Sequence, residues 1–141
     1  MGYNGSMTTH KPLFTHSARV RFAETDGMAV VWHGRYLEYL ESARIAYLDS
    51  LGMPYKSLVK NGYHLPVVEL NAQYKAPAHF DDTLLIELTG CQLEGPRLII
   101  GYTIRREKTE ILKAMTTHVF LKEGRASRPP TEFVKLLASQ K

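Results

Sequence analysis

Hydrophobic residues recur with two different spacings along this chain, and the two spacings predict one long helix among several strands. Between His33 and Leu51 the apolar side chains return every three or four residues, which is the spacing of one helix face. Gly52 is typical of the position after a helix end, and Pro54 cannot continue a helix. We therefore expect an α-helix over 33–51.

Alternating apolar and polar residues predict one strand before this helix and four longer strands after it. The later strands are joined by short connections, and short connections between long strands require antiparallel pairing. The expected strands cover residues 14–22, 65–75, 83–93, 97–106 and 111–122; short helices are expected over 54–60 and 131–138.

This order of elements indicates an α+β domain in which an antiparallel sheet covers the apolar face of the long helix. The other face of such a sheet and its edge strands remain open, and an open edge favours pairing with a second chain. We therefore expect a homo-oligomer.

The chain has the size and composition of one globular domain, with 141 residues, 44% hydrophobic and 23% charged. Gly5-Ser6-Met7 reads as a cloning junction, so we interpret residues 1–6 as a cloning scar and residues 7–141 as the domain. No apolar run approaches the roughly 20 residues of a membrane helix, and the N-terminus lacks a signal-peptide pattern. We expect no membrane insertion and a cytoplasmic location.

Positive charge is concentrated in the C-terminal third, where residues 97–141 carry 10 basic and 4 acidic side chains. Such a surface attracts phosphorylated ligands or an acidic carrier protein, or it is a solvated basic face. Nucleic acid is not expected, because the basic residues are spread along strands without a recognised binding motif. Cys91 is the only cysteine, so no internal disulfide forms, and we interpret it as a small buried hydrophobic residue.

Asp26 carries the clearest candidate chemistry, because it lies in a short loop between a predicted strand and the predicted helix start near His33. The first N–H groups of a helix are unpaired and lie at the positive end of its dipole. A carboxylate facing such donors is the minimum equipment for acyl transfer: one group attacks or activates water, and the other binds an oxyanion. The alternative is an aspartate that serves only as a turn or helix-capping residue.

Four sequence segments together resemble the hotdog-fold acyl-CoA thioesterases of the 4-hydroxybenzoyl-CoA thioesterase type, including members associated with the Tol-Pal system. The similarity runs from about Phe14 to Pro130. The segments are Thr25-Asp26 with Val30-Val31-Trp32-His33 and Tyr36; Tyr39-Leu40-Glu41-Ser42-Ala43-Arg44; Pro66-Val67-Val68-Glu69 through Tyr74-Lys75-Ala76-Pro77 to Phe80-Asp81-Asp82; and Tyr102-Thr103-Ile104-Arg105 with Thr116-Thr117-His118-Val119-Phe120.

The resemblance implies a hotdog fold, in which a five-stranded antiparallel sheet wraps a long central helix, and a dimer or a dimer of dimers with sites at the subunit interface. It implies hydrolysis of a short-chain or aromatic acyl-CoA without a metal or organic cofactor. Asp26 would be the base or the nucleophile, and the His33 backbone N–H would bind the oxyanion. The predicted substrate-binding residues are Trp32, Arg35 and Tyr36, with Arg106, Arg125 and Arg128 for the CoA phosphates.

Two positions in the loop depart from the family pattern, because Ala29 stands where members usually have glycine and Arg35 where they usually have asparagine. Glu41 is a weaker candidate for a second acid than for an ion pair with Arg44. A hotdog hydratase or dehydratase would rely on His33 and Glu41. A non-catalytic module binding acyl-CoA or acyl carrier protein would need no carboxylate at position 26.

Overall fold

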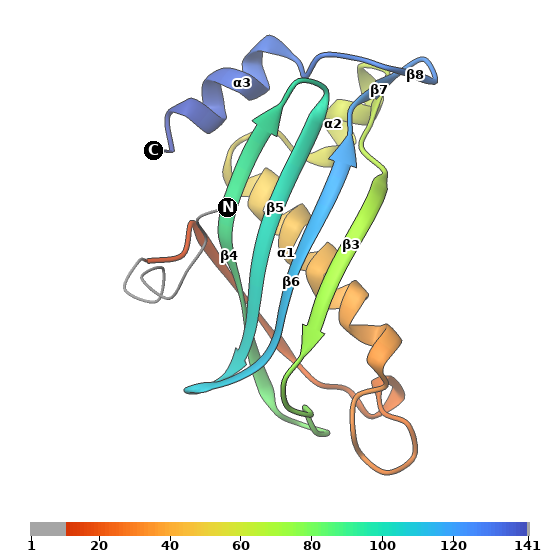
Figure 1. The fold of residues 1–141 in the computed structure, drawn as a ribbon, viewed down its shortest axis with the longest axis vertical. Helices are drawn as coiled ribbons and strands as arrows, with labels where there is room; N and C mark the ends of the chain where they lie inside the picture. The colour runs from red at the N-terminus through yellow and green to blue at the C-terminus, as the bar shows by residue number, and fades with distance from the viewer. Residues whose placement is uncertain (1–10, 141) are drawn as a thin grey trace.

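The structure is a computed structural model that describes residues 11–140, so the interpretation of residues 1–6 as a cloning scar lies outside the described part of the chain. Its main element is a five-stranded antiparallel sheet in the order β1-β4-β5-β6-β3, shown in Figure 1. The strands are β1 (Phe14–Arg19), β3 (Val67–Tyr74), β4 (Thr83–Glu94), β5 (Arg97–Arg106) and β6 (Thr109–Val119).

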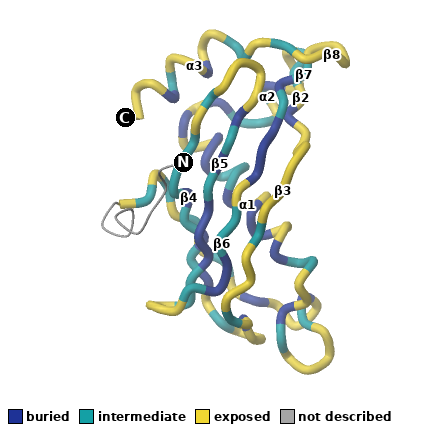
Figure 2. The backbone as a smooth tube through the Cα atoms, in the orientation of Figure 1, coloured by how far each residue is buried: buried dark blue, intermediate teal, exposed yellow. Residues whose placement is uncertain are grey.

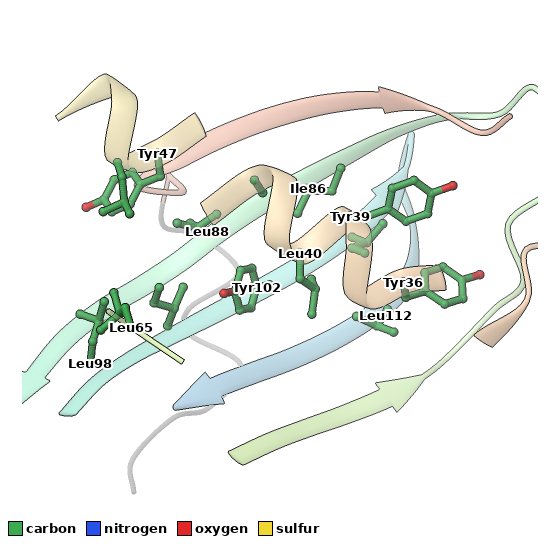
Figure 3. Close-up of a cluster of buried hydrophobic side chains, with 14 of the residues drawn as sticks. Tyr36, Tyr39, Leu40, Tyr47, Leu65, Ile86, Leu88, Leu98, Tyr102 and Leu112 are labelled. Carbon is green, nitrogen blue, oxygen red and sulfur yellow. The ribbon is translucent and has the colours of Figure 1, made fainter. Parts of the chain in front are cut away.

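The long helix α1 (Tyr36–Ser50) crosses one face of this sheet (Figure 1). Alternate residues of β5, including Ile100, Tyr102 and Ile104, are buried and pack toward the helix. Figure 3 shows Leu40 of α1 and Tyr102 of β5 in this shared hydrophobic cluster. The expected hotdog arrangement, a central helix wrapped by five antiparallel strands, is therefore confirmed.

The long helix begins later than its sequence pattern predicts. His33–Arg35 form a tight 3-10 turn, η3, and regular α-helix starts only at Tyr36. The expected ion pair between Glu41 and Arg44 is wrong, since none of the ion pairs found in residues 11–140 joins them. Glu41 is exposed, whereas Arg44 is half-buried.

The last long strand is interrupted where a continuous one was expected. Phe120 is fully buried, and its ring packs edge-on against Phe133 with centroids 5.3 Å apart. The chain leaves the main sheet at this point, so its continuation forms a second, three-stranded sheet. That sheet contains β2 (Tyr63–His64), β7 (Leu121–Lys122) and β8 (Arg125–Ala126), and it lies near α2 (Tyr55–Lys60) and α3 (Thr131–Ala138), where short helices were expected.

The two edges of the main sheet differ in exposure: β1 alternates between half-buried and exposed residues, whereas β3 is exposed along most of its length, drawn yellow in Figure 2. Seven of the eight residues of β3 are exposed, and they include the apolar side chains of Val67, Val68 and Leu70. Cys91 on β4 is half-buried rather than fully buried. No helix within residues 11–140 is long and apolar enough to cross a membrane.

A chain of buried polar side chains runs through the core beneath α1. The His118 ring is fully buried; its Nδ1 lies 3.2 Å from the carbonyl oxygen of Leu65, and its Nε2 lies 2.9 Å from the Thr116 hydroxyl. Because a carbonyl only accepts, Nδ1 carries the proton, and Nε2 accepts from Thr116 when the ring is neutral. The Thr116 hydroxyl, 2.8 Å from the hydroxyl of Tyr102, then accepts from Tyr102.

This arrangement predicts that His118 makes folding sensitive to acid. Burial, with a smaller effect of the Arg44 charge, lowers the pKa of His118 from 6.5 to about 4. The unfolded chain therefore takes up the proton first as pH falls, and stability present at neutral pH is lost between about 6.5 and 4. Chemical denaturation of wild type and His118→Gln should show wild type losing up to about 3 kcal/mol more over this range. His64→Gln, at an exposed histidine, is the control and should behave as wild type; parallel curves for wild type and His118→Gln would contradict the prediction.

Candidate active site

The segment around Asp26 is a loop closed by its own backbone hydrogen bonds. The Trp32 N–H donates to the Glu24 carbonyl at 3.1 Å, and the Asp26 N–H donates to the Val30 carbonyl at 2.9 Å. The far side of the loop is anchored to residues 78–80, because the Val31 N–H donates to the Ala78 carbonyl at 2.9 Å. Asp26 is therefore held on a fixed loop beside the helix start.

The Asp26 carboxylate is exposed and only partly used by the loop. One oxygen, Oδ1, accepts a hydrogen bond from the Met28 N–H at 2.9 Å, which is the geometry of an aspartate-stabilised turn. Among the described residues, the other oxygen has no hydrogen-bond partner. Asp26 does not cap a helix, because Trp32 and Arg35 occupy the N-cap positions of η3 and α1. Asp26 therefore stabilises the turn through one carboxylate oxygen, and its other oxygen can act as a base or a nucleophile.

Two backbone donors at the start of η3 are unpaired. The Trp32 N–H is bound by Glu24 and the Arg35 N–H by the Trp32 carbonyl, but within residues 11–140 the N–H groups of His33 and Gly34 have no acceptor. A helix cannot satisfy its first N–H groups internally, and they lie at the positive end of its dipole. This pair is suited to binding a developing oxyanion.

Trp32 covers the same helix start. Its indole is half exposed and lies 4.7 Å, centroid to centroid, from the His33 ring. The indole also lies directly over Gly34, where a Cβ atom would come within 2.0 Å of the ring. Glycine at position 34 is therefore what allows the Trp32 indole to lie over the first turn of the helix.

Tyrosine side chains fix this region from beneath. The hydroxyl of buried Tyr36 accepts from the Ala78 N–H at 3.2 Å, and burial raises the pKa of Tyr36 above its ordinary value. The Tyr74 hydroxyl donates to the His33 carbonyl at 3.1 Å. Tyr36 thus joins the loop anchor to α1, and the half-exposed Tyr74 ties β3 to the helix start.

The predicted basic residues fall in different places. Arg35 lies in η3 and forms an ion pair with Glu38 at 2.9 Å. Arg106 donates to Asp82 at 2.9 Å and to the Pro77 carbonyl at 3.0 Å, so it supports the segment that anchors the loop. Arg125 lies in β8, at the end of the molecule opposite to the start of α1 (Figure 1), and Arg128 lies between β8 and α3. Trp32, His33, Arg35 and Tyr36 lie together at the helix start, and Asp26 lies on the loop that leads to it, whereas these last two arginines lie elsewhere.

Sequence reasoning missed Glu24 at this site. Its carboxylate is 6% exposed and accepts from the Tyr39 hydroxyl at 2.6 Å. A glutamate in a polar segment next to Arg21 has the pattern of a surface residue, and the only signal was its position two residues before Asp26. Within residues 11–140, no group of three His, Cys, Asp or Glu side chains is arranged to hold a metal ion.

Comparison with known proteins identifies relatives over most of the chain. Residues 20–137 match the family model described as the thioesterase-like superfamily. YneP of Bacillus subtilis (strain 168), whose name proposes an acyl-CoA thioesterase, is 34% identical over 117 residues, covering 82% of this chain and 83% of YneP. The acyl-CoA thioesterase YbgC of Haemophilus influenzae (strain ATCC 51907 / DSM 11121 / KW20 / Rd) is 30% identical over 102 residues, covering 72% of this chain and 75% of YbgC.

A solved structure shows the same fold. Slr0204, a 1,4-dihydroxy-2-naphthoyl-CoA thioesterase from Synechocystis, superimposes with a TM-score of 0.81 at 27% identity. The match covers 89% of this chain and 95% of that one.

The loop geometry predicts that Ala29 is strained. Its φ is +65°, in the left-handed region that glycine adopts without penalty. Ala29→Gly should raise the free energy of unfolding by about 0.5–1 kcal/mol, since relief of strain exceeds the added unfolded-state entropy. Thermal unfolding measures this change. The control is Ala46→Gly in α1, which should lower stability by about 1 kcal/mol; destabilisation by both substitutions would contradict the prediction.

Proposed function

Because this chain belongs to the thioesterase-like superfamily, we propose that it hydrolyses an acyl-CoA thioester to the free acid and CoA, with Asp26 as its catalytic carboxylate. One observation carries the proposal: a carboxylate with a free oxygen is held on a closed loop that leads directly into two unpaired backbone N–H groups. A non-catalytic acyl-CoA module would not need this pairing of an acid with oxyanion donors.

The proposed reaction begins with the thioester carbonyl oxygen accepting a hydrogen bond from the His33 N–H, supported by the Gly34 N–H. These donors stabilise the negative charge that develops on that oxygen as a nucleophile adds to the carbonyl carbon. Collapse of the tetrahedral intermediate breaks the carbon–sulfur bond, and the CoA thiolate leaves and takes up a proton. The products are the carboxylic acid and CoA.

Asp26 can supply the nucleophile in two ways. It either removes a proton from a water molecule that attacks the carbonyl carbon, or it attacks that carbon itself and forms a mixed anhydride that water then hydrolyses. Both routes use the carboxylate oxygen that the loop leaves unbonded, and both consume one water per thioester.

For the substrate we propose an aromatic or short aliphatic acyl group. Support comes from the half-exposed Trp32 indole at the helix start, which offers a flat apolar surface against which an aromatic or short aliphatic acyl group could pack. Relatives act on acyl-CoA esters, including a 1,4-dihydroxy-2-naphthoyl-CoA thioesterase. Of the basic residues predicted to bind substrate, Arg35 and Arg106 lie near the loop in this chain and Arg125 and Arg128 do not, so we propose that the latter two contact CoA phosphates at the site of another copy.

We further propose that two copies pair through β3. This strand is an edge with open backbone groups, and it exposes apolar side chains that no described residue covers. Such an edge is a template for another strand.

An acyl carrier protein is the alternative carrier of the acyl group. Carrier proteins of this kind would be acidic, and the C-terminal third of this chain is basic and would attract them.

Asp26→Asn should abolish most hydrolysis while leaving the loop folded. The amide oxygen can still accept from the Met28 N–H, but it neither attacks nor removes a proton. We expect a fall of about 10²-fold or more in kcat with little change in KM. Release of free thiol from benzoyl-type and C4 to C16 acyl-CoAs measures this. Asp49→Asn, at an exposed aspartate of α1, should match wild type; hydrolysis unaffected by Asp26→Asn would exclude the proposed role, and binding without hydrolysis in wild type would indicate a binding module.

Val68→Lys should weaken self-association, because pairing along β3 would bury an unpaired ammonium group. We expect the dissociation constant of the dimer to rise by about tenfold or more, equivalent to about 1.4 kcal/mol. Sedimentation velocity over a concentration series measures it. Val59→Lys on α2 exchanges a similarly exposed valine away from β3 and should leave association unchanged; equal effects of both would argue against this edge.

A further inference from the structure

Glu24 is a buried carboxylate that accepts three hydrogen bonds from Tyr39 and Arg21. Its Oε1 accepts from the Tyr39 hydroxyl at 2.6 Å and from the Arg21 N–H at 2.9 Å, and its Oε2 accepts from the Arg21 guanidinium at 3.0 Å. Taking a carboxylate out of water costs several kcal/mol unless such bonds replace its hydration. The fold meets this cost at a residue only two positions before Asp26.

These bonds connect the loop to the helix from both sides of His33. The Glu24 side chain holds α1 through Tyr39, and the Glu24 backbone carbonyl holds the Trp32 N–H, directly before His33. A single residue therefore contacts the chain before and after the unpaired N–H groups.

Aromatic contacts complete a closed circuit around the helix start. The Tyr39 ring packs against the Tyr36 ring at 6.1 Å between centroids, and Tyr36 packs against Tyr74 at 5.7 Å. Tyr74 donates to the His33 carbonyl, and the Trp32 N–H returns to Glu24. Glu24 is the point at which the loop and the helix are joined by hydrogen bonds rather than by packing alone.

The ionised Glu24 carboxylate is suited to accepting hydrogen bonds from Tyr39 and Arg21 and not to acting as a general acid or base. Burial raises the pKa of the Glu24 carboxyl, but the hydrogen bonds from Tyr39 and Arg21 outweigh burial, and the net pKa lies below its ordinary value. Burial and the Glu24 carboxylate together raise the pKa of Tyr39. At neutral pH the acceptor stays ionised and the donor stays protonated, so the bond persists.

We propose that Glu24 is a positioning residue for thioester hydrolysis: through Tyr39 and Trp32 it sets the place of Asp26 relative to the N–H groups of His33 and Gly34. The inference rests on the proposed function. Misplacing a reacting group by about 1 Å can cost up to about 10²-fold in rate. Losing one bond of the circuit should therefore lower kcat more than it changes KM, because the alignment of the reacting groups is more sensitive to a small displacement than contact with the substrate is.

The decisive variant is Tyr39→Phe, which removes only the hydroxyl that Glu24 binds. The matched control is Tyr47→Phe, two turns further along α1, where the buried hydroxyl lies beside Cys91 of β4 and takes no part in the bonds around Glu24. We expect Tyr39→Phe to lower kcat for the best acyl-CoA about tenfold with KM within about twofold of wild type. Tyr47→Phe should leave both constants unchanged.

A second pair of variants separates positioning from general stability. Glu24→Gln keeps an oxygen that accepts from Tyr39, whereas Glu24→Leu keeps none, so kcat should largely survive in the first and fall in the second. The readout independent of activity is the fluorescence of Trp32, the only tryptophan in the chain. Because Glu24 binds its backbone, Tyr39→Phe should shift the Trp32 emission maximum, and Tyr47→Phe should not.

Two results would overturn the inference. One is equal kcat and unshifted Trp32 emission in Tyr39→Phe; the other is the same loss of kcat in both tyrosine variants, which would indicate general destabilisation. If wild type hydrolyses no acyl-CoA, the proposed function fails, and the Trp32 emission of the same variants still supports or overturns the positioning of the loop by Glu24.

Discussion

The first N–H groups of a helix cannot be bonded within that helix, and the arrangement around residue 33 depends on this constraint. Four neighbouring N–H groups differ in their partners: that of Trp32 donates to Glu24, that of Arg35 donates to Trp32, and those of His33 and Gly34 have no acceptor within residues 11–140. Tyr74 holds the same turn through the His33 carbonyl. The loop, α1 and β3 are thus fixed around a pair of donors that no residue within 11–140 uses.

The sheet contributes by making this arrangement rigid. α1 packs across the buried face of the sheet, so its first turn is held by the hydrophobic core rather than by helix propensity. The anchor segment at residues 78–80 lies directly before β4, and the loop closes against it. The loop that carries Asp26 is thus positioned by α1 and β4. Functional residues generally lie on loops that a rigid scaffold positions in this way.

The sequence pattern predicted the regular elements well because burial imposes periodicity, as at Leu40 in α1 and Ile100 in β5. The sequence pattern predicted the structure wrongly where contacts between distant residues determine the conformation. Phe120 ends a strand because its ring packs on α3, and Arg44 turns toward the core instead of pairing with Glu41. Asp26 was singled out by its place in the loop before the helix, and the oxyanion role predicted for the His33 N–H came from the family resemblance, since neither has a periodicity that would reveal it. Glu24 was missed because its burial depends on Tyr39, fifteen residues later.

The contact between Trp32 and Gly34 has a consequence for how such a chain varies over time. Any side chain at position 34 would enter the volume that the indole occupies, so a substitution there would displace the half-exposed indole of Trp32. A single change at position 34 could therefore redraw the apolar surface over this helix start without altering Trp32 itself.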